Sequence, residues 1–449
     1  MNASDVALRS VAALGLTLDA GPGSGRPADA QASNALGETG AGEVTLVTGP
    51  SGSGKSSLLQ AFVAAHATRI ATPSERWGDR WPTDVVASAG AHEPWPLLAA
   101  CGLAEAGVVL RSARTLSEGE RARLGAATAL ARAARLAQRM GSARVVLDEF
   151  CSVLDRVTAA GVAATVRRWI HRFGKRLGIG LIAATAHEDM ARLLGPNRVV
   201  RLALDGKATV NPGPARWRPA LTVAIERGSI EDFDALSKYH YRSTRPATWT
   251  RVLRAVGAGG ELAGVQVVSY PVLNAAWRNT AWPGRYSTRW RRRDARRVNR
   301  ELRCLSRAVV EPRYRGLGIA RRLVEAALAT SETPAVEGVA AMGPISPFLE
   351  RAGMTPVPIV RRPVDWRLLD ALDASGLVPG DTPWRLADPT VQRAMVEDPF
   401  LRCELESWAR VVGAAGRRAK RPGDEASLAK AAASRLMSEQ TAYVWARGS

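Results

Sequence analysis

The chain has 449 residues, of which 46% are hydrophobic, and its formal net charge is +20. This length allows two or three domains with separate cores, but no apolar run approaches the ~20 residues that cross a bilayer. The four cysteines are far apart, which argues against a disulfide framework or a zinc site. The N-terminal residues also lack the pattern of a secretory signal, so we expect a cytoplasmic protein with no membrane partner.

The excess of basic residues has two explanations. A composition bias can replace lysine by arginine, but it does not explain 62 basic residues against 42 acidic ones. A cationic surface suits a polyanionic partner, and nucleic acid, either DNA or RNA, is the main expectation.

Glycine- and proline-rich breaks divide the chain into four parts. We expect an N-terminal strand or linker segment, a first α/β domain, a second α/β domain and a mostly helical tail. Their boundaries are placed at residues 1–42, 43–215, 220–362 and 363–449. The apolar stretches at 43–49, 143–150 and 178–186 are typical of buried parallel strands, with helical patterns between them.

The stretch GPSGSGKSS follows the first of these strands and opens a predicted helix from Lys55 to Ala65. It matches GxxxxGK[ST], in which glycines let backbone N–H groups converge on phosphates. Lys55 would reach the β- and γ-phosphates, and Ser56 would offer its hydroxyl to Mg²⁺. The residues expected to bind ATP are Gly49, Pro50, Ser51, Gly52, Ser53, Gly54, Lys55, Ser56 and Ser57.

Two carboxylates end the second strand, VVLDEF. Asp148 is expected to hold Mg²⁺ together with Ser56, and Glu149 to polarise the attacking water.

Three further motifs, in this order, make the first domain resemble the ABC-type ATPase family. LSEGE resembles the LSGGQ signature in Ser117 and Gly119, SVLDR resembles the D-loop with Asp155, and His187 resembles the histidine that senses the γ-phosphate. Ser117 and Glu120 also form a helix-capping pattern, which is the purely structural alternative. The resemblance implies that two copies complete each other's ATP sites, as an ATP-dependent homodimer. The adenine-stacking aromatic residue and the Q-loop glutamine of the family are not evident.

A second anion loop is predicted in VVEPRYRGLGIARRL, where a strand passes through a turn into a helix. The stretch resembles the R/Q-x-x-G-x-G/A motif of the GNAT acyltransferases. The resemblance implies that backbone N–H groups hold the pyrophosphate of acetyl-CoA, helped by the helix N-terminus. The residues assigned to this cofactor are Val309, Val310, Arg315, Gly316, Gly318, Ile319 and Ala320.

Acyl transfer needs a base for the acceptor amine and an acid for the leaving thiolate. Tyr241 and Glu337 are the main candidates. Further candidates are Tyr239, His240 and Ser306, and Cys304 is a candidate nucleophile. Packing or ion-pairing roles explain each of them equally well.

The arrangement resembles the family of predicted ABC-type ATPases fused to an acetyltransferase domain, and its second half is loosely similar to Mom-type DNA-modifying enzymes. An arginine-rich stretch at 285–307 surrounds Trp290, which suits phosphate contacts and base stacking. We expect an ATPase coupled to an acetyl-CoA-dependent N-acyltransferase acting on a nucleic-acid-associated target. The alternatives are an ATP-switched nucleic-acid clamp with a non-catalytic GNAT fold, a transporter ATPase subunit, and a protein N-acetyltransferase.

Overall fold

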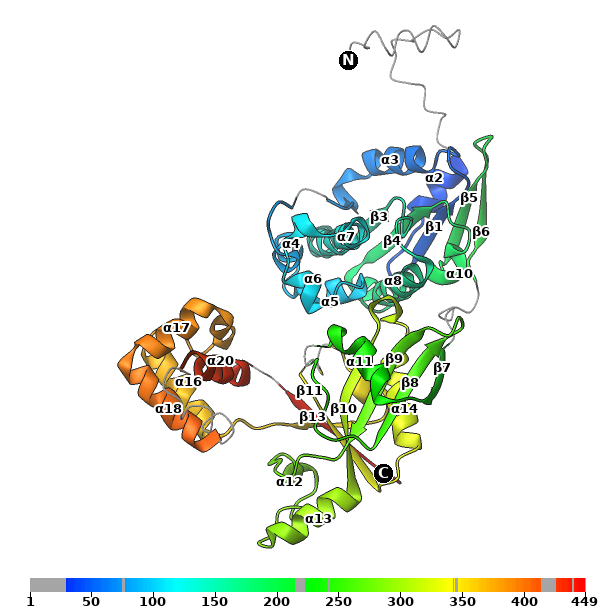
Figure 1. The fold of residues 1–449 in the computed structure, drawn as a ribbon. Coiled ribbons are helices and arrows are strands. Elements are labelled where there is room, and N and C mark those ends of the chain that lie inside the picture. Colours follow the sequence, from blue (N-terminus) through cyan, green and yellow to red (C-terminus); the bar gives the residue numbers. More distant parts are fainter. Residues whose placement is uncertain are drawn as a thin grey trace.

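The computed structural model describes residues 30–74, 77–214, 223–240, 243–341, 343, 346–412, 425–437 and 440–448. Two sheet-containing domains follow each other along the chain, and a helical unit lies beside the second (Figure 1). No helix in these ranges is both long and apolar enough to span a bilayer.

The first domain is built on a six-stranded sheet of order β2-β3-β4-β1-β5-β6, in which only β6 is antiparallel to its neighbour. The strands are β1 (Val44–Thr48), β2 (Ile70–Ala71), β3 (Ala143–Leu147), β4 (Ile179–Thr185), β5 (Arg198–Leu202) and β6 (Ala208–Pro212). Every residue of β1 and β4 is buried, as expected for a parallel sheet that helices cover on both faces. The predicted layered α/β architecture is confirmed for this domain.

The side chains of successive residues in β1 pack on opposite faces of this sheet. Leu46 packs with the core formed by α4, α5, α7 and α8, whereas Val47 packs with α2 and α3. The helices are α2 (Ala30–Gly37), α3 (Lys55–Ala65), α4 (Pro82–Ser88), α5 (Pro94–Ala100), α6 (Ala106–Val109), α7 (Glu118–Met140), α8 (Arg156–Trp169), α9 (Lys175–Leu177) and α10 (Met190–Leu194). Residues 30–37, expected in a strand or linker, are helical because Ala32, Ala35 and Leu36 pack on the sheet. Residues 1–29 of that predicted segment lie outside the described ranges.

The second domain contains a seven-stranded sheet of order β12-β13-β11-β10-β9-β8-β7. Its strands are β7 (Val223–Arg227), β8 (Arg251–Gly257), β9 (Leu262–Ser269), β10 (Leu302–Val310), β11 (Ala335–Ala340), β12 (Thr355–Pro358) and β13 (Thr441–Ala446). Its helices are α11 (Ile230–Leu236), α12 (Arg278–Ala281), α13 (Arg291–Glu301), α14 (Ile319–Ala329) and α15 (Phe348–Arg351). α14 packs on one face and α11 on the other.

The only parallel pair in this sheet is β10 with β11, and α14 forms the crossover between them. The two strands are paired only from Leu302 and Ala335 to Leu305 and Gly338. β10 continues to Val310 along β9, after a register shift between Leu305 and Arg307. The backbone pairing of β10 with β11 therefore ends at Leu305 and Gly338, whereas β10 continues to Val310 before the turn into α14.

The C-terminal region is helical, as expected, but it does not end as a helix. It contains α16 (Pro363–Ala374), α17 (Pro389–Glu397), α18 (Pro399–Val412) and α20 (Glu425–Leu436) around a separate hydrophobic core. The chain then returns as β13, which inserts between β11 and β12. Residues 363–436 are therefore an insertion in the second domain, because the last strand of its sheet lies beyond the predicted boundary at 362.

Candidate functional site

The predicted phosphate loop lies at the carboxyl edge of the first sheet. Strands β3, β4 and β1 are neighbours and run parallel, so the residues that follow them meet at one edge. The loop after β1, the carboxylates after β3 and His187 after β4 are thereby brought to the same rim of the domain. Ligands of open α/β sheets bind at such a rim.

The loop is shaped to present backbone N–H groups. Gly54 is the N-cap of α3 in a left-handed conformation, with φ 91° and ψ 13°, and no side chain caps the helix. The first N–H with a backbone acceptor in the helix is that of Leu58, which donates to the Gly54 carbonyl (2.9 Å). Among the described residues, the N–H groups of Lys55 and Ser56 have no protein acceptor. Free N–H groups at a helix N-terminus form an anion site.

Two buried polar groups of the loop also point to a ligand. The Ser53 hydroxyl is buried without a hydrogen-bond partner in the described chain. The Lys55 ammonium is buried and donates to the carbonyls of Gly49 (3.0 Å) and Pro50 (2.9 Å). Phosphate oxygens are stronger acceptors for an ammonium than carbonyls are, so the residues present fit a nucleotide.

The carboxylates after β3 are exposed and held by local bonds. Asp148 accepts from the Glu149 N–H (3.0 Å), and Glu149 accepts from the Ser152 hydroxyl (2.6 Å). Glu149 has φ 48°, a left-handed conformation that is unfavourable for a residue with a side chain. Such strain is concentrated at functional positions. In the described ranges no three His, Cys, Asp or Glu side chains form a metal site, so Mg²⁺ would have to be held with phosphate oxygens, Ser56, Asp148 and water.

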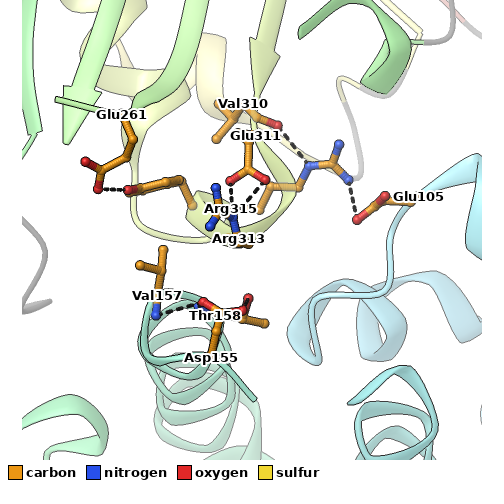
Figure 2. Close-up of polar contacts among 10 residues, drawn as sticks. Glu105, Asp155, Val157, Thr158, Glu261, Val310, Glu311, Arg313 and Arg315 are labelled. Carbon is orange, nitrogen blue, oxygen red and sulfur yellow. Dashed lines mark hydrogen bonds and ion pairs between the residues drawn. The ribbon is translucent and has the colours of Figure 1, made fainter. Parts of the chain in front are cut away.

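The signature-like and D-loop-like segments contact each other. Ser117 caps α7 in a complete capping box with Glu120, so the structural role foreseen for this serine is present. A Cβ at Gly119 would lie 2.9 Å from the Leu154 side chain, next to Asp155. Asp155 caps α8 by accepting from the N–H groups of Val157 (3.1 Å) and Thr158 (3.0 Å), as Figure 2 shows.

The second loop repeats the backbone geometry of the first. Gly318 is the N-cap of α14 with φ 83° and ψ 11°, again without a side-chain cap. The first backbone bond into the helix runs from the Arg322 N–H to the Gly318 carbonyl (3.1 Å). Within the described part of the chain, the N–H groups of Ile319 and Ala320 have no protein acceptor. A Cβ at Gly318 would meet nothing within 4 Å, so this side of the turn is open.

The other side of this turn packs against the first domain. Figure 2 shows Arg313 and Arg315 above the N-terminal end of α8. Arg315 bonds the Val310 carbonyl (3.2 Å) and pairs with Glu105 (3.4 Å). Its guanidinium pKa is lowered by burial, which Glu105 partly offsets. The Arg168 guanidinium donates to the Gly316 carbonyl. Arg315 thus serves the domain interface instead of reaching freely into a cofactor site.

Three candidates for acyl-transfer chemistry are either bonded to other side chains or have a pKa raised by burial. Both oxygens of Glu337 accept from Arg278 (2.6 and 2.7 Å), and both side chains are almost fully buried. Burial raises the Glu337 pKa, although the bonds to Arg278 oppose the shift. Burial and then Glu337 raise the pKa of the Cys304 thiol to about 12. The Ser306 hydroxyl is bonded to Ser269 (2.6 Å).

The remaining candidates for acyl-transfer chemistry are Tyr241, Tyr239 and His240. Tyr241 lies outside the described residues. Tyr239 is partly buried in the core beneath α11, with the Lys238 ammonium 5.0 Å from its ring centre. His240 is bonded within the protein. Among the described candidates, Glu337 and Ser306 are held by protein partners, and the pKa of the Cys304 thiol is raised.

The basic stretch forms α13 and the beginning of β10. Asp294 and Val298 are the buried residues of α13, and the arginines cover its outer surface. Glu301 pairs with Arg285, Arg297 and Arg300. In the described chain no carboxylate pairs with Arg291, Arg292, Arg293 or Arg296. Trp290 is 59% exposed, and α13 projects from the body of the second domain (Figure 1).

Residues 25–209 match the model of the family described as Novel STAND NTPase 1. A solved dimeric bacterial ABC transporter cassette is similar at 17% identity with a TM-score of 0.31, covering 40% of this chain and 88% of that one. A nucleotide-free ATP-binding cassette from an ABC transporter is similar at 16% identity with a TM-score of 0.28, covering 39% and 83%. Among curated proteins, none matches the chain.

The family match spans the strand, loop and helix described above, together with both carboxylates after β3. The first domain is therefore a P-loop NTPase domain. The match does not reach the second sheet.

Proposed function

We propose that the chain is an ABC-like ATPase coupled to an acetyl-CoA-dependent N-acyltransferase that acts on a nucleic-acid-associated target. The observation that carries the proposal is the repetition of one local geometry. Both loops end in a left-handed glycine that starts an uncapped helix and leaves N–H groups free. Each domain thereby has a site suited to a diphosphate.

ATP with Mg²⁺ is the ligand proposed for the first loop. The family match, the buried Lys55 and the exposed carboxylates after β3 support it. Ser117, Gly119, Asp155 and His187 would act on the nucleotide of a second copy in a homodimer, as the resemblance to ABC-type ATPases implies.

Acetyl-CoA is the ligand proposed for the second loop. Its pyrophosphate carries no γ-phosphate or essential Mg²⁺, so a cradle without a lysine suits it. The pairing of β10 with β11 ends before β10 reaches this turn, which supports a path for the rest of the cofactor between the two strands. The cofactor supplies an acetyl thioester. An acceptor amine would attack its carbonyl, so that an N–C bond forms, the C–S bond breaks and a proton passes from nitrogen to the thiolate.

Coupling between the two domains is supported by α8. Its N-cap is Asp155 in the ATPase domain, and its body contacts the second loop through Gly161 and Arg168. A shift of α8 that accompanies nucleotide binding would reach the N–H groups of the second loop through these contacts. A nucleic-acid target is supported by the unpaired arginines of α13.

Labelled acetyl-CoA tests the proposal directly. The full chain is incubated with the label, ATP and either DNA, RNA or protein, in parallel with three variants. Gly318→Glu places a carboxylate on the open side of the turn and should abolish labelling. Lys55→Ala should remove ATP binding, and Glu149→Gln should keep binding but slow hydrolysis. Label found only in protein would refute a nucleic-acid acceptor, and full labelling by Lys55→Ala would refute coupling.

The surroundings of two candidate acyltransferase residues favour a second function. Glu337 is held in a buried ion pair and Cys304 has a raised pKa, so neither of these two residues is a ready base. This favours an ATP-switched nucleic-acid clamp in which the second domain only binds its ligand. Such a clamp would bind acetyl-CoA without consuming it, and steady-state turnover separates the two functions.

A further inference from the structure

A cavity of about 460 Å³ lies in the ATPase domain, away from both loops. It is formed by the edge strand β2, the helix α7 and the segment around α4. Three strand spacings separate β2 from β1, the strand that leads into the phosphate loop, which corresponds to about 14 Å. The cavity is therefore separate from the predicted ATP site.

Four arginines line this cavity: Arg80, Arg132, Arg135 and Arg139. The last three follow one another at helical spacing on α7, so they share one side of the helix. No carboxylate lines the cavity among the residues that the structure describes. Four positive charges in one concavity repel each other unless an anion joins them.

Two of the four guanidinium groups are held in place by neutral acceptors. Arg80 donates to the Trp77 carbonyl (3.2 Å) and to the Ser88 hydroxyl (3.0 Å). Arg132 donates to the Thr72 carbonyl (3.3 Å). Carbonyls and hydroxyls orient a guanidinium without neutralising it, so both groups keep their full charge. In the described chain Arg135 and Arg139 have no ion-pair partner.

The side chain of Trp77 forms part of the cavity wall and is only 6% exposed. Its indole N–H is itself buried, so the guanidinium groups are the donors that a ligand in the cavity would meet. Guanidinium groups without carboxylates call for an electron-rich ligand.

An arginine-rich composition alone does not explain this cluster. Arg285, Arg297 and Arg300 pair with Glu301. The other arginines of α13 lie along a projecting helix, whereas these four line one concavity. A hollow of this size matches small-molecule sites, which are about 300–1,000 Å³.

We propose that this cavity binds a phosphorylated small molecule of nucleotide size, as a second ligand site of the ATPase domain. Guanidinium groups bind phosphates through paired, charge-assisted hydrogen bonds. Four of them match the charge of a di- or triphosphate better than that of a single phosphate. A nucleic-acid duplex is a poorer fit, because its phosphates are spread along a backbone, whereas the four arginines line one concavity.

The test is calorimetric titration of the full-length Lys55→Ala variant, whose phosphate loop should no longer bind ATP. The probes are inorganic tripolyphosphate, ATP and a short DNA duplex. With acetyl-CoA present in excess to occupy the second loop, tripolyphosphate and ATP should each bind at one site per chain. Adding Arg135→Gln and Arg139→Gln should weaken this binding at least tenfold.

The matched control is Arg172→Gln with Arg176→Gln, which removes two exposed arginines from the same domain. The control should leave the affinity within twofold, and thermal unfolding should show that all variants fold. Absence of binding in Lys55→Ala overturns the proposal, and so does an equal loss in both double variants. Tighter binding of the duplex, lost with Arg135 and Arg139, also overturns it in favour of a nucleic-acid site. Because the readout is binding in Lys55→Ala, failure here leaves the proposed ATPase and acyltransferase functions untouched.

Discussion

The contact between the second loop and α8 predicts an unequal response of two neighbouring glycines to alanine. Gly316 and Gly318 both have positive φ, 78° and 83°. A Cβ at Gly318 meets nothing within 4 Å, whereas one at Gly316 would lie within 3.0 Å of the Thr165 Cγ2. The two substitutions share the backbone penalty and differ in the steric clash.

The magnitudes follow from these two terms. Placing alanine in the left-handed region costs about 1–2 kcal/mol. Alanine also makes the unfolded chain less flexible than glycine does, and this offsets about 0.4–1 kcal/mol of the cost. Gly318→Ala should therefore lower the free energy of unfolding by about 1 kcal/mol. Forcing a methyl group into a packed contact adds about 1–3 kcal/mol, so Gly316→Ala should lower it by about 3 kcal/mol.

Urea unfolding of the two variants measures this difference, and Thr165→Ser identifies its source. The serine removes the clashing methyl group but keeps the hydroxyl that bonds the Gly161 carbonyl (2.8 Å). Gly316→Ala with Thr165→Ser should recover most of the extra loss. Equal losses for the two glycine variants, or no recovery with the serine, would refute the packing of this loop on α8.

Three further predictions follow from buried groups. Hydrogen bonds from Arg435 hold the pKa of Asp365 below its usual value despite burial, so their stabilisation is present above pH ~4 and is lost as the pH falls below it. Asp365→Asn should cost about 2 kcal/mol at neutral pH and abolish that pH dependence in urea unfolding. Glu337→Gln should lower the free energy of unfolding by about 3 kcal/mol because it leaves a buried guanidinium unpaired, and a loss below 1 kcal/mol would contradict that geometry. Mass spectrometry after alkylation at pH 8 should find Cys403, which is exposed, modified before Cys304, whose pKa burial raises to about 12; the reverse order would contradict the burial.

The elements of the first domain were predictable because local signals and tertiary packing agree there. The helix from Lys55 to Ala65 has the predicted bounds, since a left-handed glycine fixes its start. The strands expected at 143–150 and 178–186 appear as β3 and β4, since buried parallel strands form continuous apolar runs.

The insertion of β13 was not predictable from local pattern. Ala442 and Tyr443 are buried between β11 and β12, but a short apolar run after a long helical region does not indicate which strand it will join. Pairing across some 100 residues depends on the free edge left by β11, which is a property of the assembled sheet. The same limit applies to Arg278, whose role appears only when its chain segment closes over Glu337.

The role of Arg315 shows why motif residues need a structure. The sequence places it at the start of an anion loop, but its guanidinium pairs with Glu105 of the other domain. The groups of the turn that lack a protein acceptor in the described chain are instead backbone N–H groups after Gly318, whose direction depends on φ and not on side-chain identity. A close approach at Gly161, where a Cβ would lie 3.0 Å from the Arg315 carbonyl, fixes the same turn from the side of α8. One helix therefore holds the rear of the second loop while its own N-cap belongs to the P-loop NTPase domain. If a ligand at either end shifts this helix, linkage requires that a ligand at the other end have the reciprocal effect.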